Sequence, residues 1–243
     1  MNHLISPSET VGQIVARNFN TATVFEKYNI DFCCGGKKTL QTVCAEQHLN
    51  FDTLYLEVEE AANRQVPPSQ NAAYWSLTFL TEYIVHTHHR YVQESIPVLL
   101  KYTAKIASVH GKNHPELIEV ARLFAELAQD LLQHMKKEEI ILFPYINDLA
   151  DGNNMSIPST TFGSVNSPIM VMEQEHETAG NLMHQIRTLT HNYTLPDDAC
   201  NTYGVTFARL QEFETDLHRH VHLENNILFP KTKQLEQTLT DGK

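Results

Sequence analysis

The sequence predicts an all-α protein in which a small N-terminal helical domain is followed by an up-down-up-down four-helix bundle. Three observations lead to this fold class. Apolar residues recur at helical spacing along most of the 243 residues, and few runs alternate as strands do. Only nine glycines are present. Four long helical segments late in the chain are joined by short breaks, as in an antiparallel bundle.

The N-terminal domain is expected to span residues 1–63 and to contain four short helices. The first helix follows Thr10, and the second covers residues 22–28 with Thr21 as its cap. The third begins near Leu40, and the fourth runs from Phe51 to about Asn63. The segment Asp-Phe-Cys-Cys-Gly-Gly at 31–36 is expected to form a turn between two of them. A linker containing a Pro pair then occupies residues 64–72.

The bundle is expected to fill residues 73–243. Its four helices are predicted over roughly 74–110, 114–149, 165–192 and 197–238. The breaks between them, at 111–115, 151–158 and 193–196, each contain Gly or Pro. Connections this short favour antiparallel neighbours.

The charge balance excludes two classes of partner. The chain has 18 Lys and Arg against 29 Asp and Glu, for a net formal charge of −11. A nucleic-acid binder needs a basic surface to displace counterions, and an anionic membrane repels an acidic protein. We therefore expect neither nucleic acid nor membrane as a partner.

The ends and the cysteines indicate a cytoplasmic protein. Residues 1–10 lack the basic and apolar regions of a secretory signal, and no apolar run approaches the roughly 20 residues that span a bilayer. Four cysteines in a chain of this size do not form a disulfide scaffold, and adjacent Cys33 and Cys34 could pair only with strain. The oligomeric state, including a homodimer, is left open.

A repeated string carries the chemistry. The pattern H-x-x-x-E-x-x-x-L-F-P occurs at 134–144 and again 86 residues later at 220–230. His and Glu four residues apart lie on one helix face, so His134 with Glu138, and His220 with Glu224, can reach one side of a bundle interior. We interpret the Leu-Phe-Pro ends as packing and kink elements.

Two further histidines stand at matched distances upstream. His89 precedes His134 by 45 residues, and His176 precedes His220 by 44. Each helical hairpin thus offers one His and one His-x-x-x-Glu pair. His88 competes with His89 for the first position, and the matched separation favours His89.

These six donors predict a metal centre with vacant positions. One ion is conceivable, but two carboxylates among four imidazoles more readily bridge a pair. With an oxo or hydroxo bridge, about two of some twelve positions on two six-coordinate ions remain for solvent or a small molecule. Donor type does not by itself distinguish iron from zinc or copper. No His-Glu-x-x-His motif is present, which argues against a zinc peptidase.

The repeated strings resemble those of the hemerythrin-like bundle. Together with the Cys-Cys-Gly-Gly turn, they are similar to the iron–sulfur cluster repair di-iron proteins, the repair of iron centres family, over essentially the whole chain. That resemblance implies a non-haem centre of two iron ions held by His89, His134, His176 and His220, with Glu138 and Glu224 bridging. It also implies repair of clusters damaged by nitric oxide or oxidants, with damaged or apo iron–sulfur proteins and a small diatomic molecule, nitric oxide or dioxygen, as partners.

Four further residues are candidates for reactive or orienting roles. Cys33 and Cys34 precede a helix start and two lysines, which would favour thiolates suited to redox chemistry or iron transfer. The alternative is that they are small buried apolar residues. Glu175 beside His176 can orient a ligand or line a path to the metals, or be a solvated charge. Asp130, one turn before His134, is a second candidate to orient that ring.

Rival functions stay open at this stage. A dioxygen or nitric oxide carrier or sensor explains the bundle but gives no role to residues 8–63. A zinc-dependent hydrolase lacks a general base outside the ligand set. A regulatory bundle with a stripped site conflicts with the intact donors. Whether the centre turns over, for example as a nitric-oxide-reducing enzyme, is not decided by the sequence.

Overall fold

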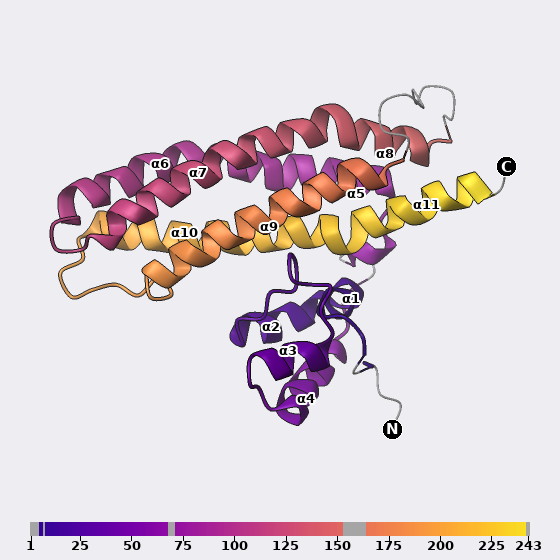
Figure 1. The fold of residues 1–243 in the computed structure, drawn as a ribbon, viewed down its shortest axis with the longest axis horizontal. Helices are drawn as coiled ribbons and strands as arrows, with labels where there is room; N and C mark the ends of the chain where they lie inside the picture. The colour runs from indigo at the N-terminus through magenta and orange to yellow at the C-terminus, as the bar shows by residue number, and fades with distance from the viewer. Residues whose placement is uncertain (1–4, 7, 68–70, 153–163, 242–243) are drawn as a thin grey trace. The chain divides into compact units, whose positions relative to one another are not determined.

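The computed structural model describes residues 5–6, 8–67, 71–152 and 164–241. Regular structure in these ranges is helical, apart from one isolated bridge between Thr10 and Thr39, so the all-α prediction is confirmed (Figure 1). Residues 68–70 of the expected linker and 153–158 of the expected second break lie outside the described residues. None of the described helices is long and apolar enough to cross a membrane.

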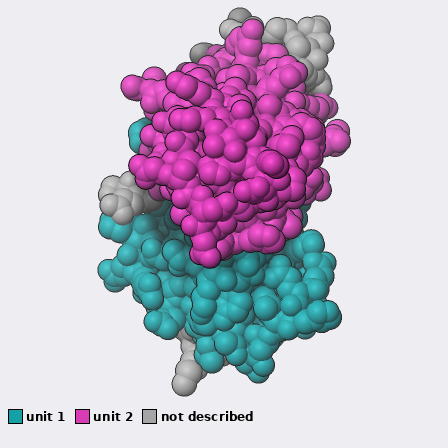
Figure 2. Space-filling model, turned by 90° about the vertical axis from the view of Figure 1, so that its left-hand side faces the viewer, with its two compact units in different colours: residues 1–80, 221–243 teal, residues 81–220 magenta. Residues whose placement is uncertain are grey.

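The chain forms two compact units, which Figure 2 colours separately. Unit 1 comprises residues 1–80 and 221–243, and unit 2 comprises residues 81–220. The division at 220/221 falls inside α10, so the helical segment that carries His220 is continuous with the one that carries Glu224.

Unit 1 contains the short helices of the N-terminal part. They are α1 (Val11–Arg17), the 3-10 turn η1 (Phe19–Thr21), α2 (Ala22–Lys27), α3 (Leu40–Glu46), α4 (Phe51–Ala62) and η3 (Ala72–Tyr74). The hydroxyl of Thr10 accepts from the Gln13 N–H and the Gln13 side chain accepts from the Thr10 N–H, a capping box that fixes the start of α1.

One expected cap in unit 1 was wrong. Thr21 precedes α2 but makes no side-chain cap bond, because its hydroxyl donates to the carbonyl of Asn18 instead. Thr39 and Asn50 do cap α3 and α4 through their side chains.

The long helices follow the four predicted segments closely. The first contains α5 (Leu77–Tyr83), η4 (Ile84–His89) and α6 (Arg90–His110), and the second α7 (Glu116–Lys137), η5 (Glu138–Leu142) and α8 (Phe143–Ala150). The third is α9 (Asn166–Leu189), and the fourth contains α10 (Asn201–Leu223), η6 (Glu224–Leu228) and α11 (Phe229–Asp241). The segments η4, η5 and η6 are π-helical.

The core of unit 2 is built by one face of each helix. α7 packs against both α6 and α9 (Figure 1), and it buries Leu123, Phe124 and Leu127. Phe124 meets Phe213 of α10 edge to face, with ring centroids 5.5 Å apart. Each such buried side chain contributes about 1.5–3 kcal/mol, so this packing supplies the rigid frame in which polar side chains can be held inside.

Candidate metal centre

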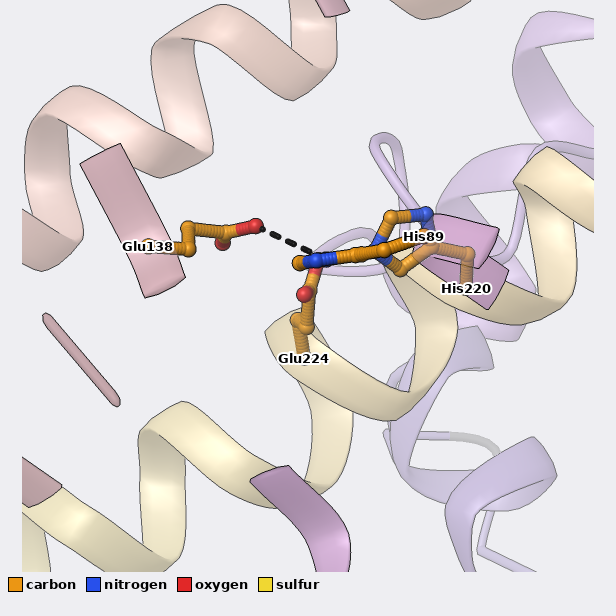
Figure 3. A group of neighbouring side chains, drawn as sticks. All are labelled: His89, Glu138, His220 and Glu224. Atoms are coloured by element: carbon orange, nitrogen blue, oxygen red, sulfur yellow. Dashed lines mark ion pairs between the residues drawn. The ribbon is translucent and has the colours of Figure 1, made fainter. Parts of the chain in front are cut away.

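The structure brings the six predicted donors together in two groups. One consists of His89, Glu138, His220 and Glu224 (Figure 3), and the other of His134, Glu138, His176 and Glu224. In each group the candidate ligand atoms lie within 4.8 Å of one another. Both groups contain the same two carboxylates and a different pair of imidazoles.

Glu138 is central to the geometry. Its Oε2 atom is 3.3 Å from the Nε2 atom of His89 and also 3.3 Å from the Nε2 atom of His134. Figure 3 shows the Glu138 carboxylate directed at His89 across the space between their helices. The Nε2 atoms of His134 and His176 approach to 2.9 Å, so these rings present the same nitrogen to one point. One carboxylate therefore faces both pairs of imidazoles.

Burial adds an energetic constraint. All six side chains are buried, and His134, the most accessible, is only 3% exposed. Placing ionised carboxylates in such surroundings costs several kcal/mol each unless positive charge compensates. A divalent cation supplies that charge. Four imidazoles with two carboxylates suit a transition metal, whereas calcium and magnesium prefer oxygen alone. The donor set therefore fits the metal centre that the sequence predicts.

Two of the imidazoles are oriented by carboxylates outside the groups. The Nδ1 atom of His134 lies 2.9 Å from Oε2 of Glu175, and the Nδ1 atom of His89 lies 2.8 Å from Oε1 of Glu139. A carboxylate at Nδ1 fixes the proton there and turns Nε2 toward the metal position. Asp130, the second candidate for this role, does not orient the His134 ring, because Glu175 holds that nitrogen.

Glu175 is well suited to this task. Its hydrogen bond with His134, assisted by Lys137, lowers the pKa of the Glu175 carboxyl to about 2. Glu139 was not anticipated. The only sequence signal was its place directly after Glu138, and nothing in the periodicity shows that it reaches a helix 50 residues away.

The structure also separates the two adjacent histidines. His89 joins the donor group, while His88 points its Nδ1 atom at Oδ1 of Asp216, at 2.9 Å. The His88 ring stacks on that of His220, with centroids 5.5 Å apart and planes inclined by 7°. His88 therefore buttresses a donor imidazole without belonging to either group.

π-helical segments mark the places where donors enter. η4 ends at His89, η5 begins at Glu138 and η6 begins at Glu224. In both repeats the N–H of the Phe residue donates to the carbonyl of the Glu five residues earlier, Phe143 to Glu138 and Phe229 to Glu224. Single π-turns of this kind add one residue to a helix and are frequent at functional sites.

The Leu-Phe-Pro strings explain two of these π-turns. Pro144 and Pro230 have no N–H, and a proline ring clashes with the carbonyl four residues back. An α-turn is therefore disfavoured just before each proline, and the wider i to i+5 bond relieves the conflict. Each string therefore shapes the backbone: the π-turn begins at the Glu, whose carbonyl accepts the Phe N–H, and it ends just before the proline.

The Cys-Cys turn is organised by one carboxylate. Asp31 accepts the N–H groups of Cys33 and Cys34 on Oδ1, both at 2.9 Å, and that of Gly35 on Oδ2 at 2.8 Å. The Cys33 thiol also donates to Oδ1, with 3.2 Å between Sγ and oxygen. Asp31, Cys33 and Cys34 form a third group of donors close enough to hold a metal ion.

The expected thiolate at Cys33 was wrong. The neighbouring Cys34 thiol, burial, and the Asp31 carboxylate together raise the pKa of Cys33 well above its usual range. The Lys38 ammonium, which was expected to help, is bound to Glu46 at 2.6 Å. Burial, Cys34 and Asp31 therefore favour the thiol over the thiolate at Cys33.

Cys200 has the opposite environment. It is exposed at the start of α10, where the N–H groups of Tyr203 and Thr202 and the His110 side chain lower the pKa of its thiol. The Nε2 atom of His110 is 3.2 Å from Sγ. Cys44 is buried, and burial raises the pKa of its thiol.

Comparisons with known proteins indicate which family has this combination of segments. Residues 80–232 match the family described as the hemerythrin HHE cation binding domain, and residues 7–62 match ScdA_N, a domain of unknown function. The iron-sulfur cluster repair protein YtfE of Musicola paradisiaca is 37% identical over 92% of this chain and 95% of its own. The repair protein ScdA of Staphylococcus haemolyticus is 32% identical over 94% of this chain and 99% of its own.

Replacing Pro144 by Ala is expected to lower the metal content of the protein. The new N–H allows an α-turn to form where the π-turn stands, which displaces the Glu138 carboxylate. Metal bound per chain, measured by elemental analysis after native purification, should fall to about half or less, since one of two shared carboxylates is lost to the site. Pro97→Ala is the matched control, because Pro97 lies inside α6 away from any π-turn. Equal metal in both variants would contradict this role of Pro144.

The thiols are expected to be alkylated in a fixed order. A lowered pKa means a larger thiolate fraction below pH 8, and a raised pKa means a smaller one. Iodoacetamide at pH 7 should therefore label Cys200 first, with Cys44 and Cys33 well behind, and the gap should narrow as the pH rises. Peptide mapping by mass spectrometry measures each site. Preferential labelling of Cys33 at pH 7 would show that its environment is misassigned.

Proposed function

Because the chain belongs to the hemerythrin family and to the iron–sulfur cluster repair proteins, we propose that it takes part in repairing iron–sulfur clusters damaged by oxidative or nitrosative stress. Support comes from the relatives' printed names and from the extent of the match, which includes both the bundle and the Cys-Cys turn. Damaged or apo iron–sulfur proteins are then its protein partners, in the cytoplasm.

The cofactor in this proposal is a pair of iron ions. The single observation that carries it is the sharing of Glu138 and Glu224 by two groups that otherwise contain different histidines. Two carboxylates common to two imidazole pairs is the arrangement expected of bridges between two ions. His89 and His220 would hold one ion, and His134 and His176 the other. Bound iron would supply redox chemistry and exchangeable positions for nitric oxide or dioxygen.

The remaining residues around the centre have supporting tasks. Glu139 and Glu175 hold protons at the Nδ1 atoms of His89 and His134, which keeps each Nε2 unprotonated and facing inward. Phe143 covers the His89 ring at a centroid distance of 5.7 Å. These contacts keep the donors in place whether or not iron is being exchanged, which is what a centre that releases iron requires.

The Cys-Cys turn is the proposed acceptor of iron. A thiolate, not a thiol, binds metal, so Cys33 must first lose its proton. The Cys33 S–H already donates a hydrogen bond to Oδ1 of Asp31, so that oxygen would take the proton as the bond from sulfur to iron forms, and Asp31 lies in the same donor group. In this proposal the iron that passes through the turn is a substrate and not a resident cofactor. Burial keeps the Cys33 thiol protonated until iron arrives.

A carrier or sensor of dioxygen or nitric oxide is the alternative. Such a carrier or sensor would need only the helical bundle and its donor groups. The organised Asp31, Cys33 and Cys34 turn favours the repair function, because a carrier gives this donor group nothing to do.

Replacing Glu138 by Leu, or Glu224 by Leu, is expected to remove most of the bound iron. Each change deletes a carboxylate that serves both ions, so both should be lost together. Iron per chain and near-ultraviolet absorption measure the effect. Glu126→Leu is the matched control, since Glu126 is an exposed partner of Arg122 on α7. Two irons per chain in either ligand variant would overturn the ligand assignment.

Cluster recovery should depend on the thiols. Anaerobic incubation of the iron-loaded protein with an apo iron–sulfur protein and sulfide should restore the cluster absorption of the apo protein. Cys33→Ser and Cys34→Ser should slow this recovery about tenfold or more while leaving iron content unchanged, because serine binds iron poorly. Cys44→Ser is the control. Recovery at the wild-type rate in both turn variants, with reversible dioxygen binding, would favour the carrier.

A further inference from the structure

The two repeated strings differ at the two positions after the ligand Glu. In the first string these are Glu139, whose carboxylate is hydrogen-bonded to the His89 ring, and the exposed Ile140. In the second they are Asn225 and Asn226. Both pairs lie in a π-turn, so the same backbone device presents different side chains.

Asn225 and Asn226 bind the backbone of the Cys-Cys turn. The Nδ2 atom of Asn226 donates to the carbonyl of Phe32 at 2.9 Å, and that of Asn225 donates to the carbonyl of Cys33 at 3.3 Å. All four residues belong to unit 1. Consecutive carbonyls of the turn are therefore held by consecutive amides that directly follow Glu224.

The turn is shaped to admit Asn226. A Cβ atom on Gly12 would stand 2.3 Å from Oδ1 of Asn226, and one on Gly36 would stand 3.1 Å from the same oxygen. The Gly12 N–H also donates to the Gly36 carbonyl at 2.9 Å, which ties α1 to the turn. Two glycines thus leave space for one amide, and α1 contacts η6 at this place.

His222 completes the arrangement. Its Nδ1 atom is 3.0 Å from Nδ2 of Asn226, so both hydrogens of that amide are used. The His222 ring is buried and packs on Phe19 and Phe32, with centroids 5.4 and 5.8 Å away. These contacts fix the direction in which Asn226 points. The Asn226 amide is therefore held in one orientation by a hydrogen-bond network.

We propose that Asn225 and Asn226 are positioning residues that dock the Cys33–Cys34 turn on the π-turn beginning at Glu224, keeping Cys33 closed to solvent and in place to receive iron. The part that concerns iron rests on the proposed function. The part that concerns docking does not. Because the carbonyls of Phe32 and Cys33 accept from these amides, removing the donors frees the turn to open.

Asn226→Asp is the sharpest variant, since it keeps the side chain's shape and removes both N–H donors. Cys33 should then be alkylated by iodoacetamide about tenfold faster at fixed pH, because the open turn is more populated. Cys44 serves as the internal reference and should not change. Ile140→Asp introduces the same residue at the equivalent position of the first string and is the matched control.

Gly12→Ala tests the same contact from the other side. Its methyl group would displace the Asn226 amide and should also open the turn. Gly204→Ala is its control, since a Cβ there would meet only Leu195 Cδ1 at 3.5 Å. This second variant keeps the proposal testable if Asn226→Asp does not fold.

Iron measurements separate the two parts of the proposal. Iron per chain should be unchanged in Asn226→Asp, while transfer to an apo iron–sulfur protein should fall about fivefold or more as docking is lost. Unchanged alkylation of Cys33 in both variants would overturn the docking. Faster alkylation with undiminished transfer would overturn the positioning role. If the wild-type protein transfers no iron, the proposed function fails, and the alkylation rates still decide the docking.

Discussion

The structure depends on two carboxylates buried among four imidazoles. Glu138 and Glu224 are fully enclosed, and ionised groups in such surroundings are stable only beside compensating positive charge. The packed apolar core meets this requirement by holding helices that are distant in sequence rigidly around one place. Glu139 and Glu175 extend the same logic outward, since each holds an imidazole with its donor nitrogen facing inward.

Backbone geometry delivers these groups as much as side-chain choice does. Both Glu residues stand at the start of a π-turn closed by a Phe N–H and followed by a proline. The two strings share this backbone geometry but differ at the two residues that follow the Glu. One uses the next residue to orient a donor ring, and the other uses the next two to hold the Cys-Cys turn. A duplicated motif has thus acquired two different local environments.

The sequence was sufficient for the helices and the donors, because both depend on spacing. Apolar periodicity located the four long segments. The repeated string identified four of the six residues that the structure brings together, and the matched separations upstream identified His89 and His176. Properties that depend on partners far along the chain were out of reach. The pKa of Cys33 is raised by Cys34, by burial and by Asp31, and the burial depends on the fold, so the expected thiolate was wrong. The reach of Glu139 to His89, and of Asn226 to Phe32, has no periodic signature. Two of the π-turns, η5 and η6, had one local signal, the proline six residues after each Glu, which removes an N–H and disfavours an α-turn before it.

The π-turn also bears on how such a protein can change over time. Adding or removing one residue between Glu and Pro would rotate everything downstream by about 100° around the helix axis, so the length of this stretch is constrained. In the first repeat, the identity of residue 140 is much less constrained, since Ile140 is 62% exposed. A position that is fixed in register but tolerant in composition, directly after a donor carboxylate, is a site where new contacts can arise without moving the donors. Asn225 and Asn226 occupy that segment in the second repeat, and the same stretch of the first repeat offers an equivalent, still unused position at Ile140.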